Sequence, residues 1–107
     1  MRILVVSDTH GDEGALWRAI DAQPEARIIV HLGDGAREAA DMAARYPGRT
    51  FWQVRGNCDF TAGGPPAARE ELAGGKRLFM THGHLYDAKM GLYRLTCAAR
   101  ERQADVL

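Results

Sequence analysis

Residues 3–12 read ILVVSDTHGD, so an apolar run leads directly into a cluster of polar side chains. The run is rich in β-branched residues and does not alternate with polar ones, which predicts a strand over residues 2–7 that is covered on both faces. Asp8 and His10 lie two positions apart, and side chains at that spacing in an extended chain point to the same side. We therefore expect Asp8 and His10 to converge on one point where the strand ends.

The composition indicates one small globular domain. The chain has 107 residues, of which 46% are hydrophobic, and its 14 basic and 14 acidic residues give a net charge of zero. Nucleic-acid-binding surfaces usually carry a clear basic excess, so we expect no nucleic-acid partner. No apolar run reaches the length of a membrane span, and no signal peptide is expected. Cys58 and Cys97 form neither a disulfide framework nor a CxxC motif, so we expect a cytoplasmic protein.

Strand-like and helix-like segments alternate over the first half of the chain. After the first strand we predict helices over 12–23 and 36–46 and strands over 26–32 and 50–54. This alternation predicts right-handed βαβ crossovers and a parallel sheet.

The second half of the sequence has a different pattern. It predicts a loop over 61–69, a hairpin whose strands 69–73 and 76–82 flank Gly74 and Gly75, a helix over 87–103, and the start of a further strand at 104–107.

Polar motifs stand at the ends of four predicted strands: SDTH (7–10), HLGDG (31–35), VRGNCD (54–59) and MTHGH (80–84). Taken singly, each has an ordinary explanation, such as an aspartate that caps the next helix, a tight turn, a polar loop or a core histidine at His31. Ligands of open α/β sheets bind at the carboxyl ends of the strands. The shared position of the four motifs therefore favours a metal site.

The candidate ligands offer carboxylate, imidazole and amide groups, and they are Asp8, His10, Asp34, Asn57 and His82. A set without thiolates suits manganese, iron, nickel or zinc better than a structural all-cysteine zinc site. A carboxylate can bridge two cations, which lie about 3.5–4 Å apart in two-metal hydrolytic sites. Asp34 follows the central strand and is the expected bridge.

In this order, SDTHG, HLGDG, RGNCD and MTHGH resemble the calcineurin-like metallophosphoesterases, most closely their branch of small bacterial and archaeal phosphodiesterases. The resemblance covers essentially the whole chain as a single domain over residues 1–107. It implies an α/β fold, an αββα sandwich whose second sheet is largely missing here, and hydrolysis of a small phosphodiester at a binuclear metal centre. Manganese or nickel is frequent in this branch.

The same resemblance implies a division of the ligands between two metals. Asp8 and His10 would bind the first metal, Asp34 would bridge, and Asn57 and His82 would bind the second. His84 would be a neighbour of the site.

One departure from the family concerns the group that protonates the leaving group. Many phosphomonoesterases of the superfamily have a histidine after the site asparagine, whereas this chain has Cys58, as the phosphodiesterase branch commonly does. A thiol with a pKa near 8.5 donates a proton less readily than imidazolium, and a buried filler is the alternative role. Asp59 would orient this group, hold a water or cap a turn.

Polar residues next to the candidate ligands are suited to contact the substrate. We assign Asn57, Arg55 and His84 to substrate binding, with a solvated strand-end side chain as the alternative for Arg55.

A second departure is that the sequence stops before the Gly-His-x-His motif, which gives each metal one more histidine in the family. We therefore expect three protein ligands for each metal, weak or absent activity of this chain, and uncovered apolar faces around Phe79 and Met80. Two explanations stay open. The sequence is a truncated part of a longer protein, or it is a shortened natural protein that forms a homodimer through the uncovered sheet.

Two other functions are alternatives to the hydrolase. The first is a non-catalytic scaffold or interaction module of the same fold, against which the presence of all five candidate ligands speaks. The second is a flavodoxin-like nucleotide or phosphoacceptor domain, which shares the βαβ start but would need a glycine-rich turn after the first strand.

Overall fold

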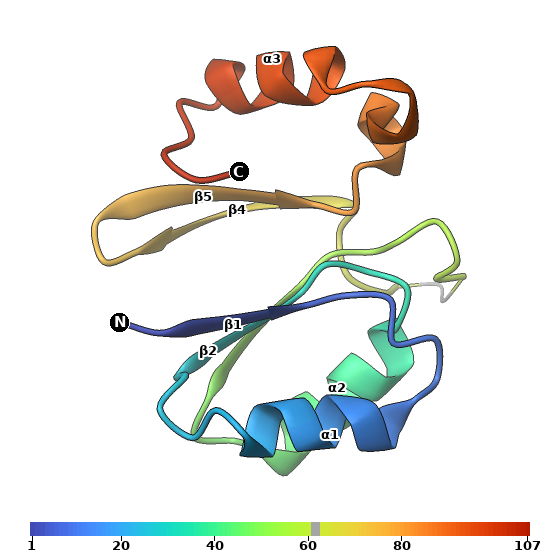
Figure 1. Cartoon of the computed structure of the whole chain (residues 1–107), viewed down its shortest axis with the longest axis vertical. Coiled ribbons are helices and arrows are strands. Elements are labelled where there is room, and N and C mark those ends of the chain that lie inside the picture. The colour runs from blue at the N-terminus through green and yellow to red at the C-terminus, as the bar shows by residue number, and fades with distance from the viewer. Residues whose placement is uncertain (61–62) are drawn as a thin grey trace.

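The computed structural model describes residues 1–60 and 63–107, and these residues form four layers (Figure 1). Helices α1 (Glu13–Asp21) and α2 (Ala36–Arg45) cover the outer face of a first sheet. A second sheet lies on the other face, and α3 (Tyr93–Glu101) covers its outer side. The α–β–β–α layering that the family resemblance implied is confirmed.

The first sheet is parallel, as predicted, and contains β1 (Ile3–Val6), β2 (Ile28–His31) and β3 (Thr50–Gln53) in that order. Ile28 pairs with Ile3 on one side and with Thr50 on the other, so the three strands begin level with one another. Their carboxyl ends consequently meet at one edge of the sheet. The polar motifs after the strands begin at this edge.

The prediction that the first strand is covered on both faces is wrong. β1 is the edge strand of its sheet, and the Val5 side chain is 56% exposed. By contrast, three of the four residues of β2 are buried, since this strand has a neighbour on each side. Val5 instead lines an apolar groove between the two sheets.

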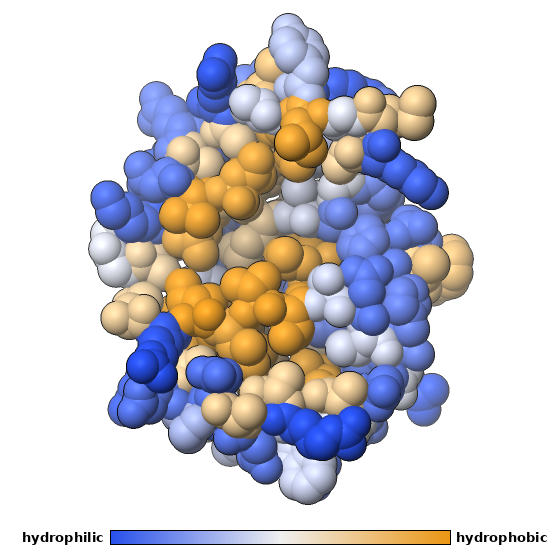
Figure 2. Space-filling view, in the orientation of Figure 1, coloured by the Kyte–Doolittle hydropathy of each residue, from blue (hydrophilic) through white to orange (hydrophobic). Residues whose placement is uncertain are grey.

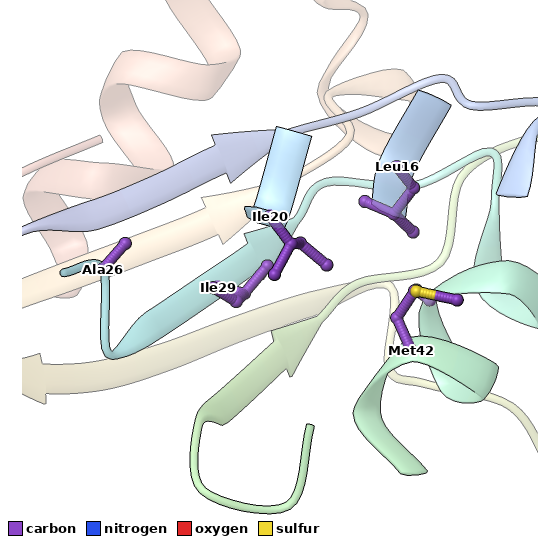
Figure 3. Packing of buried hydrophobic residues seen from close by; sticks show 6 residues of the cluster. Leu16, Ile20, Ala26, Ile29 and Met42 are labelled. Atoms are coloured by element: carbon purple, nitrogen blue, oxygen red, sulfur yellow. The ribbon is translucent and has the colours of Figure 1, made fainter. Parts of the chain in front are cut away.

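The core beneath the first sheet is built from helical side chains at one-turn spacing (Figure 3). Leu16 and Ile20 lie four residues apart in α1 and therefore share one face of that helix. They pack with Met42 of α2 against Ile29 of the central strand, and all four side chains are essentially fully buried. This packing attaches both helices to the sheet.

The cap of α1 decides one alternative left open by the sequence. The Asp12 carboxylate accepts a hydrogen bond from the Ala15 N–H at 3.0 Å, so Asp12 begins the helix. Asp8 is therefore not the capping residue.

The second sheet is the predicted hairpin of β4 (Ala68–Ala73) and β5 (Lys76–Thr81). Gly74 and Gly75 have φ angles of 56° and 77°, the left-handed pair that a tight hairpin turn requires. Val106 pairs in parallel with Leu78, which confirms the strand-like start expected at 104–107. The loop predicted over 61–69 extends two residues into β4, and its residues 61 and 62 lie outside the described part of the chain.

The prediction of one helix over 87–103 is wrong in its first part. Two 3-10 turns, His84–Tyr86 and Ala88–Met90, precede α3. Asp87 and Gly91 have φ angles of 51° and 147°, and a right-handed helix cannot pass through such residues. None of the helices in the described residues has the length and apolar character that a membrane span requires.

Phe79 and Met80 are themselves buried, although both line an open apolar groove, so the expectation of uncovered apolar faces around them holds only for the groove. Phe79 packs edge-on against Tyr86 with ring centroids 6.0 Å apart, and the Arg102 guanidinium lies 4.6 Å from the Phe79 ring centroid. Met80, on the other face of the hairpin, packs against Trp52 of the first sheet. The hairpin thus has apolar contacts on both faces.

This open apolar surface lies between the sheets, where Figure 2 shows hydrophobic residues around a hollow. The groove has a volume of about 310 Å³, and its lining includes Val5, Leu32, Leu78, Phe79 and Met80. The homodimer, one of the two alternatives that the sequence left open, stays a prediction.

The core beneath the sheet predicts a clear difference between two substitutions. Ile20→Ala leaves a cavity at a side chain that is 0% exposed, and it should lower the free energy of unfolding by about 2–5 kcal/mol. Leu72→Ala shortens a side chain that is 67% exposed, so it should change the free energy of unfolding by less than about 0.5 kcal/mol. Urea denaturation followed by circular dichroism measures both. Equal losses in the two variants would contradict the assigned packing.

Candidate metal centre

The turns after β1 and β2 are joined by two backbone hydrogen bonds. The Asp8 N–H donates to the Gly33 carbonyl at 2.8 Å, and the His10 N–H donates to the Asp34 carbonyl at 2.9 Å. Asp8, His10 and Asp34 have left-handed φ angles of 55°, 45° and 59°. Such conformations cost non-glycine residues about 1–3 kcal/mol each and persist where surrounding contacts fix them. The paired turns thus hold three candidate ligands in a strained arrangement.

The side chains of four predicted ligands meet above these turns. His10 Nε2 lies 3.4 Å from Asp8 Oδ1 and 3.9 Å from Asp34 Oδ2. His82 Nε2 approaches the same Asp34 Oδ2 atom to 3.3 Å. Ligand atoms of Asp8, Asp34 and His82 all lie within 4.8 Å of one another. Asp34 Oδ2 therefore lies near imidazole nitrogens from two different loops.

The hydrogen bond of His82 fixes which of its nitrogens can bind a cation. His82 Nδ1 lies 2.8 Å from the Leu32 carbonyl oxygen, and a carbonyl only accepts, so Nδ1 carries the proton. In the neutral ring, Nε2 then presents a lone pair toward the Asp34 carboxylate. A backbone partner on one nitrogen and a free lone pair on the other is the usual state of a metal-bound histidine. The residues present fit a divalent metal.

Asp34 is held from the opposite side by the turn after β3. This side chain is 5% exposed, and its Oδ1 accepts the Cys58 N–H at 2.8 Å, which leaves Oδ2 for the histidines. A Cβ at Gly56 would lie 2.1 Å from Oδ1, so the close approach needs glycine. Asn57 lies in this turn with an exposed side chain, and its role as a ligand stays a prediction.

Asp59 binds backbone N–H groups from two loops. Its carboxylate accepts the N–H groups of Asp34, Gly35, Ala36 and Gly56 at 2.8–3.1 Å. Burial raises the pKa of Asp59, but these four hydrogen bonds outweigh it and leave the pKa below its usual value. These contacts are typical of a residue that caps a turn, which is one of the roles that the sequence left open for Asp59. The catalytic role of Asp59 stays a prediction.

Asp8 is ionised at neutral pH. A hydrogen bond from the Ser7 side chain lowers the pKa of Asp8 below its usual value and outweighs the opposing effect of burial. The site therefore presents negative charge, which favours a cation.

Three further predicted residues lie on exposed parts of the same loops. Cys58 and Arg55 belong to the loop after β3, and His84 follows β5 with its ring centroid 5.7 Å from that of His82. Desolvation raises the pKa of the Cys58 thiol, and the Asp34 carboxylate raises it further. These positions stay predictions as substrate contacts or as a proton donor.

Sequence reasoning missed a buried polar group next to this centre. Glu38 in the first turn of α2 is 6% exposed, and its carboxylate accepts hydrogen bonds from the Thr9 hydroxyl and the Gly11 N–H. The available signal was an acidic residue in the first turn of a helix, which is common for local capping reasons. His31 is 1% exposed and is the core histidine that the sequence allowed.

Comparisons with known proteins agree with this geometry. The calcineurin-like phosphoesterase superfamily domain matches residues 1–107. The probable metallophosphoesterase YsnB of Bacillus subtilis is 34% identical over 112 residues, which cover 100% of this chain and 61% of that protein. The chain thus spans about three fifths of that relative's length.

Two solved structures are also similar to the chain. A predicted phosphoesterase from Streptococcus pneumoniae superposes with a TM-score of 0.77 at 31% identity, over 95% of this chain and 56% of that one. Yfce, a phosphoesterase from E. coli, superposes with a TM-score of 0.63 at 27% identity, over 83% of this chain and 61% of that one.

The four hydrogen bonds of Asp59 predict a stability loss in Asp59→Asn. An amide group has one accepting oxygen, and its NH₂ group would face N–H donors, so the free energy of unfolding should fall by about 1–3 kcal/mol. Asp12→Asn is the matched control, because asparagine caps helices about as well as aspartate does. Thermal and urea unfolding measure both variants. A stable Asp59→Asn protein would refute this supporting role.

Proposed function

This chain belongs to the calcineurin-like phosphoesterase superfamily, and we propose that it forms the metal-binding core of a hydrolase that cleaves phosphodiesters with two divalent cations. Manganese is the first choice of metal, with nickel, iron and zinc as alternatives. The substrate is a small phosphoester, and the proposed location is the cytoplasm. The observation that carries the proposal is the position of the Asp34 carboxylate.

The position of the Asp34 carboxylate supports its proposed role as a ligand that two cations share. One of its oxygens is within 3.9 Å of His10 Nε2 and within 3.3 Å of His82 Nε2, while the other oxygen is occupied by a backbone N–H. His10 also neighbours Asp8, and His82 follows β5 on the second sheet. The two histidines therefore reach the carboxylate from different elements, as ligands of a metal pair would.

When bound, the cations would neutralise charge on the phosphoryl oxygens and lower the pKa of a water molecule toward neutrality. The chain's own residues hold this arrangement. The Asp8 and Asp34 carboxylates supply the negative charge, and His82 is oriented by the Leu32 carbonyl. Asn57 completes the proposed ligand set. The strained turns keep these groups in position before a substrate binds.

Exposed residues around the centre are assigned to the substrate. Arg55 and His84 supply positive or hydrogen-bonding groups for the non-bridging phosphoryl oxygens. Cys58 is the proposed donor of the proton to the leaving alcohol, because its raised pKa keeps the thiol protonated in the metal-free chain. Asp59 holds the Cys58 loop through the Gly56 N–H.

A scaffold module of the same fold is the alternative function, and metal binding separates the two. A scaffold has no need of an imidazole lone pair directed at a buried carboxylate, whereas a hydrolase does. This observation favours the hydrolase.

The proposal predicts metal-dependent hydrolysis that depends on Asp34. With added Mn²⁺, the chain should hydrolyse bis-p-nitrophenyl phosphate slowly. Asp34→Asn should reduce the rate by more than about 100-fold, because losing a direct ligand exceeds the 10–100-fold effect of losing a supporting contact. Glu25→Gln is the matched control, since this exposed carboxylate precedes β2 at the opposite edge of the sheet and pairs with Arg2. Unchanged activity in Asp34→Asn would exclude the assigned metal role.

The proton donor gives a separate prediction. Cys58→Ala should slow cleavage of a diester with an alkyl alcohol leaving group by about 100-fold, because an alkoxide leaves poorly without protonation. Cleavage of bis-p-nitrophenyl phosphate should change little, since p-nitrophenolate is a good leaving group. Measuring kcat/KM for both substrates tests this. Equal losses on the two substrates would rule out proton donation by Cys58.

A further inference from the structure

A largely buried chain of hydrogen bonds lies beside the candidate metal centre and joins four parts of the fold. The Thr9 hydroxyl lies 2.9 Å from Glu38 Oε2 and 3.0 Å from His31 Nε2. His31 Nδ1 lies 3.2 Å from the Gly33 nitrogen, and Glu38 also accepts the Gly11 N–H. The chain thus connects α2, the turn after β1, the end of β2 and the turn after β2.

The proton positions in this chain follow from its donors. The Gly33 N–H donates to His31 Nδ1, so the His31 proton is on Nε2. His31 Nε2–H then donates to the Thr9 oxygen, and the Thr9 hydroxyl donates to the Glu38 carboxylate. Each group has one consistent role. The network therefore has a single arrangement that fixes the Thr9 side chain.

The capping of α2 by Asp59 explains why Glu38 is available to this network. A glutamate at the third position of a helix commonly reaches back to the N–H of the N-cap residue. Here the N-cap residue is Gly35, and its N–H donates to Asp59 at 3.0 Å instead. Glu38 is consequently directed to the turn that carries Asp8 and His10.

The packing at Gly35 leaves room for this network but not for a side chain at position 35. A Cβ at Gly35 would lie 2.0 Å from the Thr9 hydroxyl oxygen and 2.7 Å from His31 Nε2. Even an alanine would displace the network. The backbone of the ligand turn after β2 is thus in direct contact with the groups that support the ligand turn after β1.

We propose that Thr9 and Glu38 are positioning residues, which hold Asp8 and His10 in the left-handed conformations that direct their side chains at the metal. Thr9 lies between these two ligands, and Glu38 contacts the chain on both sides of His10, at Thr9 and at Gly11. This inference rests on the proposed function for the identity of the ligands. In this proposal, Glu38 stabilises the strained turn after β1 but does not itself bind the metal.

The test compares the Mn²⁺ affinity of wild type, Thr9→Val and Thr9→Ser by isothermal titration calorimetry. Valine has the shape of threonine without the hydroxyl, so Thr9→Val should raise the Kd for Mn²⁺ by about 10- to 100-fold. Thr9→Ser restores the hydroxyl and should stay within about threefold of wild type. Thr50→Val is the matched control, because Thr50 is exposed at the start of β3, away from the ligand edge.

A metal-free measurement accompanies the titration. In Thr9→Val without metal, the amide hydrogens of His10 and Gly11 should exchange on the order of tenfold faster, because the turn opens locally. If Thr9→Val does not fold, Glu38→Gln replaces it, with changes expected in the same direction.

The outcomes separate this inference from the proposed function. A Thr9→Val protein that loses stability but keeps the wild-type Kd and exchange rates would overturn the inference and leave Thr9 a structural residue. Wild type that binds Mn²⁺ without hydrolysing phosphoesters would refute the hydrolase but not the positioning role. If wild type binds no Mn²⁺, the proposed metal centre fails, and unchanged exchange in Thr9→Val would refute the positioning role as well.

Discussion

Two backbone hydrogen bonds, from Asp8 to the Gly33 carbonyl and from His10 to the Asp34 carbonyl, join the loops on which the candidate centre depends. They connect the two turns beyond the last residue pair of β1 and β2, where the chain would otherwise diverge. Asp8, His10 and Asp34 have left-handed φ angles in these turns. Strain of this kind is stable only where many contacts oppose it, and it is typical of functional sites. The contacts that shape the sheet edge therefore also place the candidate ligands of the site.

Two carboxylates, the buried Glu38 and the half-buried Asp59, support this edge in different ways. Asp59 accepts N–H groups from the turns after β2 and β3, so it holds the start of α2 against the loop that carries Cys58. Glu38 accepts groups from the turn after β1. Burial opposes ionisation of both, yet hydrogen bonds lower the pKa of each below its usual value. Their negative charges also face the same end of the sheet as Asp34, which favours a cation there.

The sequence predicted the features that depend on local pattern. The strand ends predicted that Asp8, His10 and Asp34 lie close together, because parallel strands bring their carboxyl ends to one edge, and these side chains do meet there. His82 reaches the same carboxylate from the antiparallel hairpin, and the roles of these residues as metal ligands stay predictions. The sequence did not predict the role of Glu38, because the spacing of 29 residues between Glu38 and Thr9 has no periodic signature. The exposed Val5, the buried Phe79 and the late start of α3 likewise depend on which faces meet in three dimensions.

In the proposed centre, the Asp34 carboxylate is shared between two cations. X-ray diffraction from crystals grown with Mn²⁺, with data collected at the manganese absorption edge, tests this sharing. Two anomalous peaks about 3.5–4 Å apart are expected, both bonded to Asp34, one beside His10 and the other beside His82. A single peak at Asp34, or no peak bonded to this carboxylate, would contradict the sharing.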